Sequence, residues 1–369
     1  MSGGDGPLVV EAEPAFRTAH ANPYNARLYT TMAAHGCRVR DLSYLRLFTR
    51  RVDVVHLHWP ELTFLTGRSW RVLARMLLFR AGLRVARLRN GTKLVWTVHN
   101  VASHERRATP ALRAMHHRLL VEEVDGLLSL TEGGLDAARN AFPELEGVPA
   151  AVTPHGHYRD DYDFGATRSE ARARLGIRPE ATLVVSVGMI REYKNIPALV
   201  RTVVAGDADL VLAVAGKPAS PALAEEIRAA ASGDPRIVLD LAFQSDEAIA
   251  TWLRAADLVV LPYRAIQNSG SAVLALSADR PVVVPALGAM QELQDAVGPA
   301  WVRCFAGEFD DAELAASAAW ATGVARSDRA PLDRLDWDGI AEDTAAFYRQ
   351  VRGERAAPAS VAVHETARS

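Results

Sequence analysis

The sequence lacks an excess of charge of either sign, because its 369 residues contain 42 Lys and Arg against 44 Asp and Glu. This balance excludes an overall electrostatic footprint for nucleic acid, although a local basic patch is still compatible with it. Cysteine is scarce, and Cys37 and Cys304 lie far apart without forming a CxxC pair. We therefore expect two unpaired thiols and neither a disulfide framework nor a thiolate metal site.

Long hydrophobic runs are also lacking. A membrane-spanning helix needs about 20 predominantly apolar residues, whereas the longest uncharged stretch, residues 265–278, contains Gln267, Asn268 and three serines. The N-terminal segment MSGGDGPLVVEAEP has neither the basic nor the apolar region of a secretory signal. Together with the unpaired thiols, these absences predict a cytoplasmic protein.

What the sequence does contain is an alternation of short β-branched runs with longer helical patterns. In the first half, a helix is expected over 26–35 with Gly36 as its C-cap, and another begins after Thr131 as its N-cap. Strands are expected at 8–11, 52–57, 93–98, 126–130 and 150–153. Strands separated by helical stretches indicate a parallel sheet in an α/β fold.

The same alternation restarts in the second half. Helices are expected over 196–204, over 221–231 and after Ser245, and a closing helix over 336–351. Strands are expected at 182–187, 210–215, 237–240, 258–261 and 282–284. We predict two Rossmann-like α/β domains with parallel sheets facing a central cleft, over 1–165 and 166–335. The segment 159–176 reads as their link, 336–352 as a cross-over helix, and 353–369 as a flexible tail.

One loop after a strand of the second half carries two cations. It follows residues 182–187 and contains Gly188, Arg191 and Lys194. Ligands of open α/β sheets bind at the carboxyl ends of the strands. Fixed cations there stabilise the charge that develops on a departing diphosphate. A solvated basic turn is the alternative interpretation.

A second loop is built from small residues. Asn268, Ser269, Gly270 and Ser271 follow the strand 258–261 and precede a helix expected over 272–278. Small residues let backbone N–H groups approach a phosphate, and the helix N-terminus adds a favourable dipole. A capped tight turn would have the same composition, so both interpretations stay open.

These loops bring out a resemblance that covers nearly the whole chain. It resembles nucleotide-sugar glycosyltransferases of the two-Rossmann GT-B type, close to family 4 and to divergent enzymes of surface-polysaccharide assembly. Gly188 and Lys194 match the Gly-Arg…Lys element, with Met189 at its arginine position, where Arg191 could supply the cation. The Glu-x-Gly…Glu motif is matched without its glutamates, with Asn268 at the first and Ala275 near the second.

The resemblance implies a nucleotide-diphosphate sugar as co-substrate and no metal or other cofactor. It implies that the first domain binds the acceptor and the second the donor, through Gly188, Arg191, Lys194 and 268–271. It also implies that the closing helix crosses back to the first domain. Independently of the resemblance, no HExxH helix and no carboxylate triad with ligand spacing occurs in the sequence.

Three histidine-rich loops follow strands of the first half. They carry His58 and Glu61, then His99, Asn100 and Glu105, then His155, Gly156 and Tyr158. Polar residues at the ends of buried strands suit a binding site, so we expect one shared cleft.

An inverting transfer needs a general base near the acceptor oxygen. We predict Glu61 or Glu105 as that base and His99 as a sugar-binding or orienting residue, since a histidine at that position of the resembled family lies near the donor sugar. We predict that His58, Asn100, His155, Gly156 and Tyr158 line the cleft.

Residues 68–93 contain eight cations and no acid, interleaved with aromatic and aliphatic residues. This pattern predicts an amphipathic helix that contacts an anionic membrane, at the inner face of which a lipid-linked acceptor would be delivered. A packed helix with a solvated face is the alternative. Nucleic acid is disfavoured, because no recognition motif accompanies the patch.

The function predicted from these residues is transfer of a hexose from a nucleotide-diphosphate donor to a hydroxyl of a glycan, lipid-linked or small-molecule acceptor. Two alternatives remain. One is a nucleotide-sugar 2-epimerase of the same fold, and the other is a catalytically degenerate transferase that acts as a binding partner. A NAD oxidoreductase is disfavoured, because no GxGxxG opens either domain.

Overall fold

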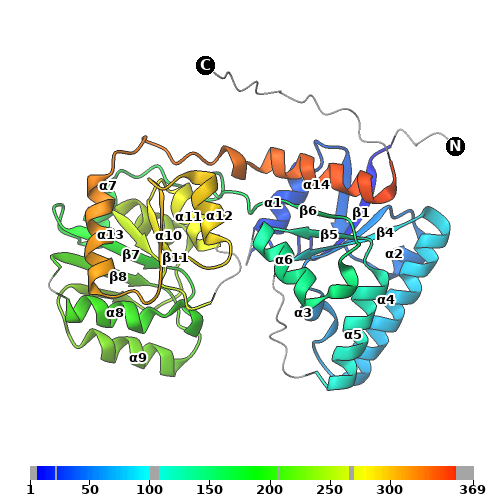
Figure 1. Cartoon of the computed structure of the whole chain (residues 1–369), viewed down its shortest axis with the longest axis horizontal. Helices are drawn as coiled ribbons and strands as arrows, with labels where there is room; N and C mark the ends of the chain where they lie inside the picture. Colours follow the sequence, from blue (N-terminus) through cyan, green and yellow to red (C-terminus); the bar gives the residue numbers. More distant parts are fainter. Residues whose placement is uncertain (1–5, 21–22, 100–107, 207, 266–269, 355–369) are drawn as a thin grey trace, which may run out of the picture. The chain divides into compact units, whose positions relative to one another are not determined.

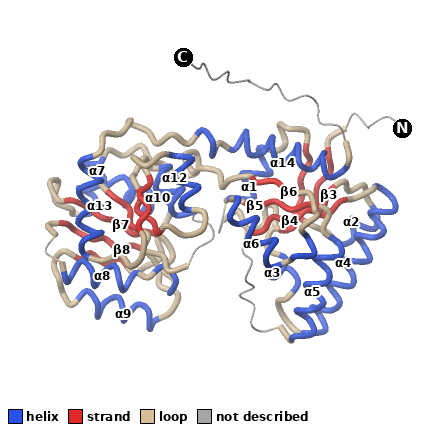
Figure 2. The backbone as a smooth tube through the Cα atoms, viewed as in Figure 1, coloured by secondary structure: helices blue, strands red, loops and turns tan. Residues whose placement is uncertain are grey.

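The computed structural model describes residues 6–20, 23–99, 108–206, 208–265 and 270–354. The chain divides into two compact units. The first unit comprises Met1–Ser129, Leu135–Thr153 and Trp337–Ser369, and the second comprises Leu130–Gly134 and Pro154–Asp336. In each unit helices flank a sheet of strands (Figure 1, Figure 2).

The sheet of the first unit has the strand order β2-β1-β3-β4-β5-β6, and every described pair is parallel. The strands are β1 (Leu8–Glu13), β2 (Cys37–Asp41), β3 (Val54–Leu57), β4 (Lys93–Val98), β5 (Gly126–Ser129) and β6 (Ala150–Val152). The sequence pattern missed β2, because this edge strand carries two exposed arginines where a buried strand would carry aliphatic residues.

The helices of the first unit begin and end at recognisable residues. Gly91 ends the longest helix in the left-handed region, at φ 65°. Thr131 acts as the predicted N-cap, since its hydroxyl accepts a hydrogen bond from the Gly134 N–H at 3.0 Å. These helices are α1 (Tyr24–Thr31), α2 (Tyr44–Thr49), α3 (Pro60–Phe64), α4 (Ser69–Asn90), α5 (Pro110–Glu123) and α6 (Glu132–Ala141).

The closing helix, α14 (Trp337–Arg352), packs on the first unit and contacts α1 (Figure 1). The rings of Trp337 and Tyr24 are in edge-to-face contact, with their centroids 5.5 Å apart. Further along the helix, a Cβ at Gly126 would come within 2.8 Å of the Val351 side chain, so glycine is needed for this close approach. The predicted return of this helix to the first domain is therefore confirmed.

The second unit holds a sheet of order β12-β11-β10-β7-β8-β9, again parallel throughout the described pairs. Its strands are β7 (Thr182–Val187), β8 (Leu210–Ala215), β9 (Ile237–Asp240), β10 (Leu258–Val260), β11 (Val282–Pro285) and β12 (Val302–Phe305). Its helices are α7 (Arg168–Leu175), α8 (Ile196–Ala205), α9 (Pro221–Ala231), α10 (Asp246–Ala255), α11 (Gly270–Ser277), α12 (Met290–Val297) and α13 (Asp311–Gly323). The parallel α/β architecture predicted for both halves is confirmed.

The segment that the sequence suggested as a link is packed into the second unit. At its start, the Arg159 guanidinium donates to Asp279 Oδ1 at 2.8 Å and to the Ala330 carbonyl at 2.7 Å. In α7, the buried Arg172 donates to the carbonyl of Ala255 at 3.0 Å and pairs with Asp257 at 2.5 Å. The main segment of the second unit runs from Pro154 to Asp336, and the domain bounds at 165 and 335 stay a prediction. Most of the predicted tail lies outside the described residues.

Candidate active site

Two neighbouring strands of the first unit bring two predicted site histidines together. β3 pairs in parallel with β4, so the residues that follow these strands meet at the same edge of the sheet. His58 follows β3 and His99 follows β4, and His58 Nδ1 lies 2.9 Å from His99 Nε2. His99 also stacks on Trp59, with ring centroids 4.3 Å apart and an interplanar angle of 18°.

This pair continues inward as a buried hydrogen-bonded chain, which we call the histidine chain. The Tyr29 hydroxyl lies 2.5 Å from His58 Nε2 and 2.8 Å from His56 Nδ1. His56 is itself held at Nε2 by the Thr97 hydroxyl at 2.7 Å and at Nδ1 by the Tyr348 hydroxyl of α14 at 2.6 Å. The chain therefore joins residues of α1, β3, β4 and α14, and it includes His99 after β4.

Burial keeps the described inner members of the histidine chain neutral. It lowers the pKa of His56 to about 3 and the pKa of His58 well below its usual value, and it raises the pKa of Tyr29. A neutral imidazole carries one N–H, so each ring donates at one nitrogen and accepts at the other. The chain can thus run in two senses, and the sense decides which nitrogen of His99 carries its proton.

The other residues predicted for the first domain are less well defined. Glu61 lies in the first turn of α3 and is half-buried. Asn100 and Glu105 lie outside the described residues. Their predicted roles stay predictions.

In the second unit, the loop after β7 approaches the loop after β8 closely. Gly188 has a φ of 104°, in the region that favours glycine. A Cβ on Gly216 would lie 2.0 Å from the Gly188 carbonyl oxygen, so no side chain fits there. This tight backbone leaves room above Gly188, where a Cβ would lie 4.0 Å from Lys194 Nζ.

Lys194 is the central side chain of this region. It is 9% exposed, and its Nζ lies 3.5 Å from Ser271 Oγ in the first turn of α11 and 5.6 Å from the centre of the Tyr263 ring. Within the described part of the chain, no carboxylate lies within ion-pair distance of it, and burial lowers its pKa. A buried ammonium without a counter-charge beside a helix N-terminus forms a site for an anion.

The predicted partners of Lys194 are only partly brought together. α11 begins at Gly270, two residues before the predicted start, and Ser271 contacts Lys194. Arg191 is exposed, and its guanidinium contacts the Met189 sulfur at 3.5 Å. Asn268 and Ser269 lie outside the described residues.

The third histidine loop lies in the second unit, which corrects its expected place in the first half. The chain has left the first sheet at Thr153, so His155, Gly156 and Tyr158 belong to the other unit. There a Cβ on Gly270 would meet the Tyr158 hydroxyl at 3.1 Å and His155 Nε2 at 3.6 Å. The loop therefore packs against the N-terminus of α11, near the residues predicted to bind the donor.

The hydrogen-bond partners of His155 determine which of its ring nitrogens carries the proton. Its Nδ1 lies 2.8 Å from the Gly156 carbonyl, which can only accept, so Nδ1 carries the proton. Its Nε2 then accepts from the Tyr158 hydroxyl at 3.2 Å. Burial lowers the pKa of His155 to about 4, so the ring is neutral at pH 7.

The predicted amphipathic helix of the basic stretch is present as α4, but much of its charge is neutralised. Arg80 pairs with Glu122 and Glu123 of α5, and Arg87 with Glu123 and Asp125. The pairing could not be predicted from the pattern within 68–93, because these acids lie some 36 to 43 residues away in the sequence. No described helix is long and apolar enough to cross a membrane, and no group of three described His, Cys, Asp or Glu side chains is arranged to hold a metal ion.

Comparison with known proteins identifies the family. The model of the family described as glycosyl transferases group 1 matches residues 181–320. A GDP-mannose:glycolipid 4-beta-D-mannosyltransferase of Xanthomonas campestris pv. campestris is 31% identical over 338 residues, which cover 91% of this chain and 90% of that protein. The chain belongs to the group 1 glycosyltransferases. The predicted function of a nucleotide-sugar-dependent glycosyltransferase is thereby confirmed.

Other members and folds resemble this glycosyltransferase less closely. A D-inositol 3-phosphate glycosyltransferase of Mycobacterium leprae is 27% identical over 322 residues, or 82% of this chain and 70% of that protein. Among solved structures, sucrose-phosphate synthase from Thermosynechococcus elongatus superimposes with a TM-score of 0.65 at 16% identity, covering 94% of this chain and 99% of that one. Anabaena HepE in complex with UDP and glucose superimposes with a TM-score of 0.58 at 14% identity, covering 94% of this chain and 98% of that one. These structures show the GT-B fold.

The glycosyltransferase carries candidate site residues that the sequence did not single out. Tyr29, Thr97 and Tyr348 form hydrogen bonds in the histidine chain. The rings of Tyr24 and His99 are in edge-to-face contact, with their centroids 5.5 Å apart. No sequence motif surrounds any of these residues, so nothing in the sequence indicated them. Only the period-two spacing of His56 and His58 in and after β3 was a local signal.

Proposed function

We propose that this glycosyltransferase transfers mannose from GDP-mannose to a glycolipid acceptor. The observation that carries the proposal is the match to the Xanthomonas campestris mannosyltransferase, which extends over nine-tenths of both chains. Because the match includes both units, it supports a common acceptor class as well as a common donor.

The proposal predicts selective stabilisation by one nucleotide sugar. A ligand that binds only the folded state at 100 times its Kd stabilises it by about 2.7 kcal/mol. We expect GDP-mannose to raise the Tm by several degrees, and UDP-glucose and GDP-glucose to do so less. Transfer of radiolabelled mannose into a lipid extract tests the acceptor. Stabilisation by UDP-sugars in preference to GDP-mannose would contradict the donor assignment.

For the donor, we propose that Lys194 binds the diphosphate, with Gly188, Gly270 and Ser271 around it. The support is the buried ammonium beside the first turn of α11, which has no carboxylate partner among the described residues. Backbone N–H groups at that helix end add donors for phosphate oxygens. Arg191, Asn268 and Ser269 remain further candidates for the same diphosphate.

For the acceptor, we propose that His99 contacts the reacting sugar and that Glu61 or Glu105 removes the hydroxyl proton. The hydrogen bond between His58 and His99 couples the protonation of the two rings, so we propose His58 as a positioning residue. The pH profile of kcat/KM tests this arrangement. His58→Gln should shift that profile as well as lower its maximum, whereas a purely structural role would only lower it.

We also propose that α4 docks on an anionic membrane, where a glycolipid acceptor resides. Its inner face, with Met76 and Phe79, is buried, while Trp70, Leu77 and Leu88 on its outer face are 63%, 53% and 89% exposed. Arg71 lies against Trp70 at 5.2 Å from the ring centre, which places a cation beside the apolar residues. Apolar residues flanked by arginines are typical of helices that lie in the membrane interface.

The docking proposal predicts a loss of vesicle binding when the exposed apolar residues of α4 are replaced. We expect Trp70→Ser with Leu77→Ser to reduce co-sedimentation with phosphatidylglycerol vesicles at least tenfold, because two inserted side chains are lost. The matched control is Phe243→Ser with Leu287→Ser, which removes two exposed apolar residues of the second unit, 78% and 41% exposed. Equal binding by both double variants would contradict docking through α4.

A further inference from the structure

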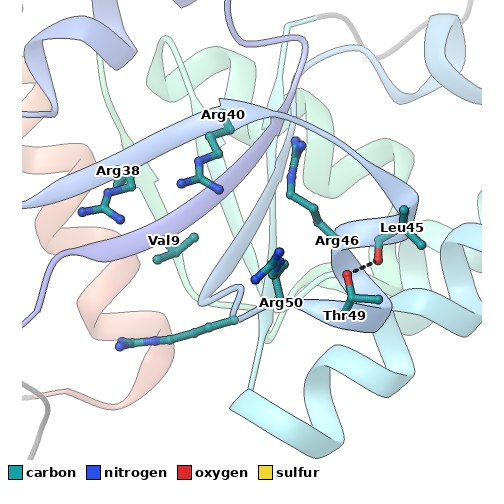
Figure 3. A pocket seen from close by; sticks show the side chains of 8 residues that line it. Val9, Arg38, Arg40, Leu45, Arg46, Thr49 and Arg50 are labelled. Carbon is teal, nitrogen blue, oxygen red and sulfur yellow. Dashed lines mark hydrogen bonds between the residues drawn. The ribbon is translucent and has the colours of Figure 1, made fainter.

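A cavity of about 620 Å³ in the first unit is lined by five arginines (Figure 3). Arg38 and Arg40 come from β2, Arg46 from α2, and Arg50 and Arg51 from the chain that leads from α2 to β3. Val9, at the start of β1, lies among them. The cavity therefore lies near the amino ends of β1 and β3, whereas the histidine chain reaches His99 at the carboxyl ends of the strands.

Two of these arginines already have counter-charges. Arg46 donates to the buried Glu11 through Nε at 2.6 Å, and Arg51 pairs with the buried Asp53 at 3.1 Å. The remaining three are Arg38, Arg40 and Arg50. Among the described residues, none of their three guanidinium groups forms an ion pair or a hydrogen bond with another residue. No acidic residue lines the cavity among the described side chains.

Protection of the sheet edge accounts for only part of this arrangement. β2 is an edge strand, and charged side chains on edge strands prevent pairing with other chains. That role explains Arg38 and Arg40, which alternate along β2 and so share one face. It does not explain Arg50, which reaches the same cavity from a different element. Figure 3 shows Arg38, Arg40 and Arg50 arranged around Val9.

Like charges that converge on one concave surface repel each other, and a bound anion removes that repulsion. Guanidinium groups match the oxygens of phosphate in planar, paired hydrogen bonds. We propose that this arginine cavity binds a phosphate-bearing anion, at a site separate from the donor site of the second unit. The phosphate comes either from a small soluble ester or from the headgroup of an anionic phospholipid, which α2 could reach because it packs against α4.

The test uses inorganic pyrophosphate titrated into the full chain by calorimetry. Because pyrophosphate would also bind at Lys194, every protein in the series carries Lys194→Met. We expect the triple variant Arg38→Gln, Arg40→Gln, Arg50→Gln to bind pyrophosphate at least tenfold more weakly than its parent. The matched control, Arg174→Gln, Arg178→Gln, Arg334→Gln, removes three exposed charges from the second unit and should bind as the parent does.

A parallel arm distinguishes the two sources of phosphate. Phosphatidylglycerol vesicles are co-sedimented with the same proteins, and phosphatidylcholine vesicles are the neutral reference. A loss of vesicle binding confined to the cavity variant, without binding of pyrophosphate, supports the site and assigns it to a lipid headgroup. Binding of pyrophosphate that only the cavity variant loses supports a soluble ester. Equal behaviour of the cavity and control variants in both arms overturns the proposal.

Two single variants guard against misfolding of the triple variant. Arg40→Gln and Arg50→Gln change different elements, and each should weaken binding about threefold if both face one ligand. Unchanged binding in both single variants overturns the proposal as well. The donor panel described above does not depend on this cavity, so failure here leaves the proposed function untouched.

Discussion

We expect Lys194→Met to lower kcat at least 100-fold while the Tm stays equal to that of the wild type or rises. The buried ammonium lies beside the first turn of α11 without a carboxylate partner in the described residues. A fixed cation that faces the leaving diphosphate contributes most in the transition state, where removal of one such group typically costs 100- to 1,000-fold in rate. Its burial costs desolvation free energy, which an apolar side chain of similar length would not incur.

The opposite changes in rate and stability make this experiment discriminating. A lysine that only supports the fold would lower both the Tm and kcat when replaced. Lys93→Met is the matched control, since Lys93 pairs with Asp125 at 3.2 Å and lies on β4 of the first unit, whereas α11 belongs to the second unit. Wild-type turnover by Lys194→Met would remove the donor-site assignment.

The second large effect is a loss of stability in mild acid that arises from buried histidines. Burial lowers the pKa of His56 to about 3, of His116 to about 4, and of His58 well below its usual value. In the unfolded chain these rings titrate near pH 6.5. Between the two values the unfolded state binds more protons than the folded state, so the free energy of unfolding falls as the pH falls. Each histidine contributes about 1.4 kcal/mol per pH unit there, and the stability is fully present above pH 6.5.

His116 offers a way to isolate one of these contributions. It lies in α5, and its Nε2 is buried without a hydrogen-bond partner in the described part of the chain. His116→Leu should therefore reduce the pH dependence of urea unfolding by about 1 kcal/mol per pH unit between pH 6 and pH 5, with stability at pH 7 kept or raised. His117→Leu, a half-buried neighbour on the same helix, is the control. Identical slopes for the two variants would contradict the assignment.

The sequence predicted the parts of the fold in which one local pattern decides the structure. Aliphatic runs such as Thr182–Val187 and Leu210–Ala215 are buried on both faces of a parallel sheet, so their limits were predicted to the residue. β2 was not predicted, because its exposed arginines interrupt the aliphatic pattern of a buried strand. Residues 159–176 were predicted as a link because their acids and aromatic residues resemble a loop. In the structure, Arg159 and Arg172 form hydrogen bonds within the second unit.

The candidate site also contains residues that a local sequence pattern indicates and residues that only the structure brings together. Gly188, Lys194 and Ser271 could be proposed from the sequence because they lie in segments that follow strands of a parallel sheet, where such folds bind ligands. Their roles stay predictions. The surroundings of His58 were not, because Tyr29 and Tyr348 reach it and His56 from helices at opposite ends of the chain. Pairings over several hundred residues are fixed by the packing of whole elements, and no local sequence pattern encodes them.

The hydrogen bond between Tyr348 and His56 has a consequence for biosynthesis. During translation, the strands and early helices of the first unit leave the ribosome well before α14 does. The histidine chain is therefore incomplete until α14 has been made. Chains that end before α14 would expose the side of α1 and β5 that this helix covers.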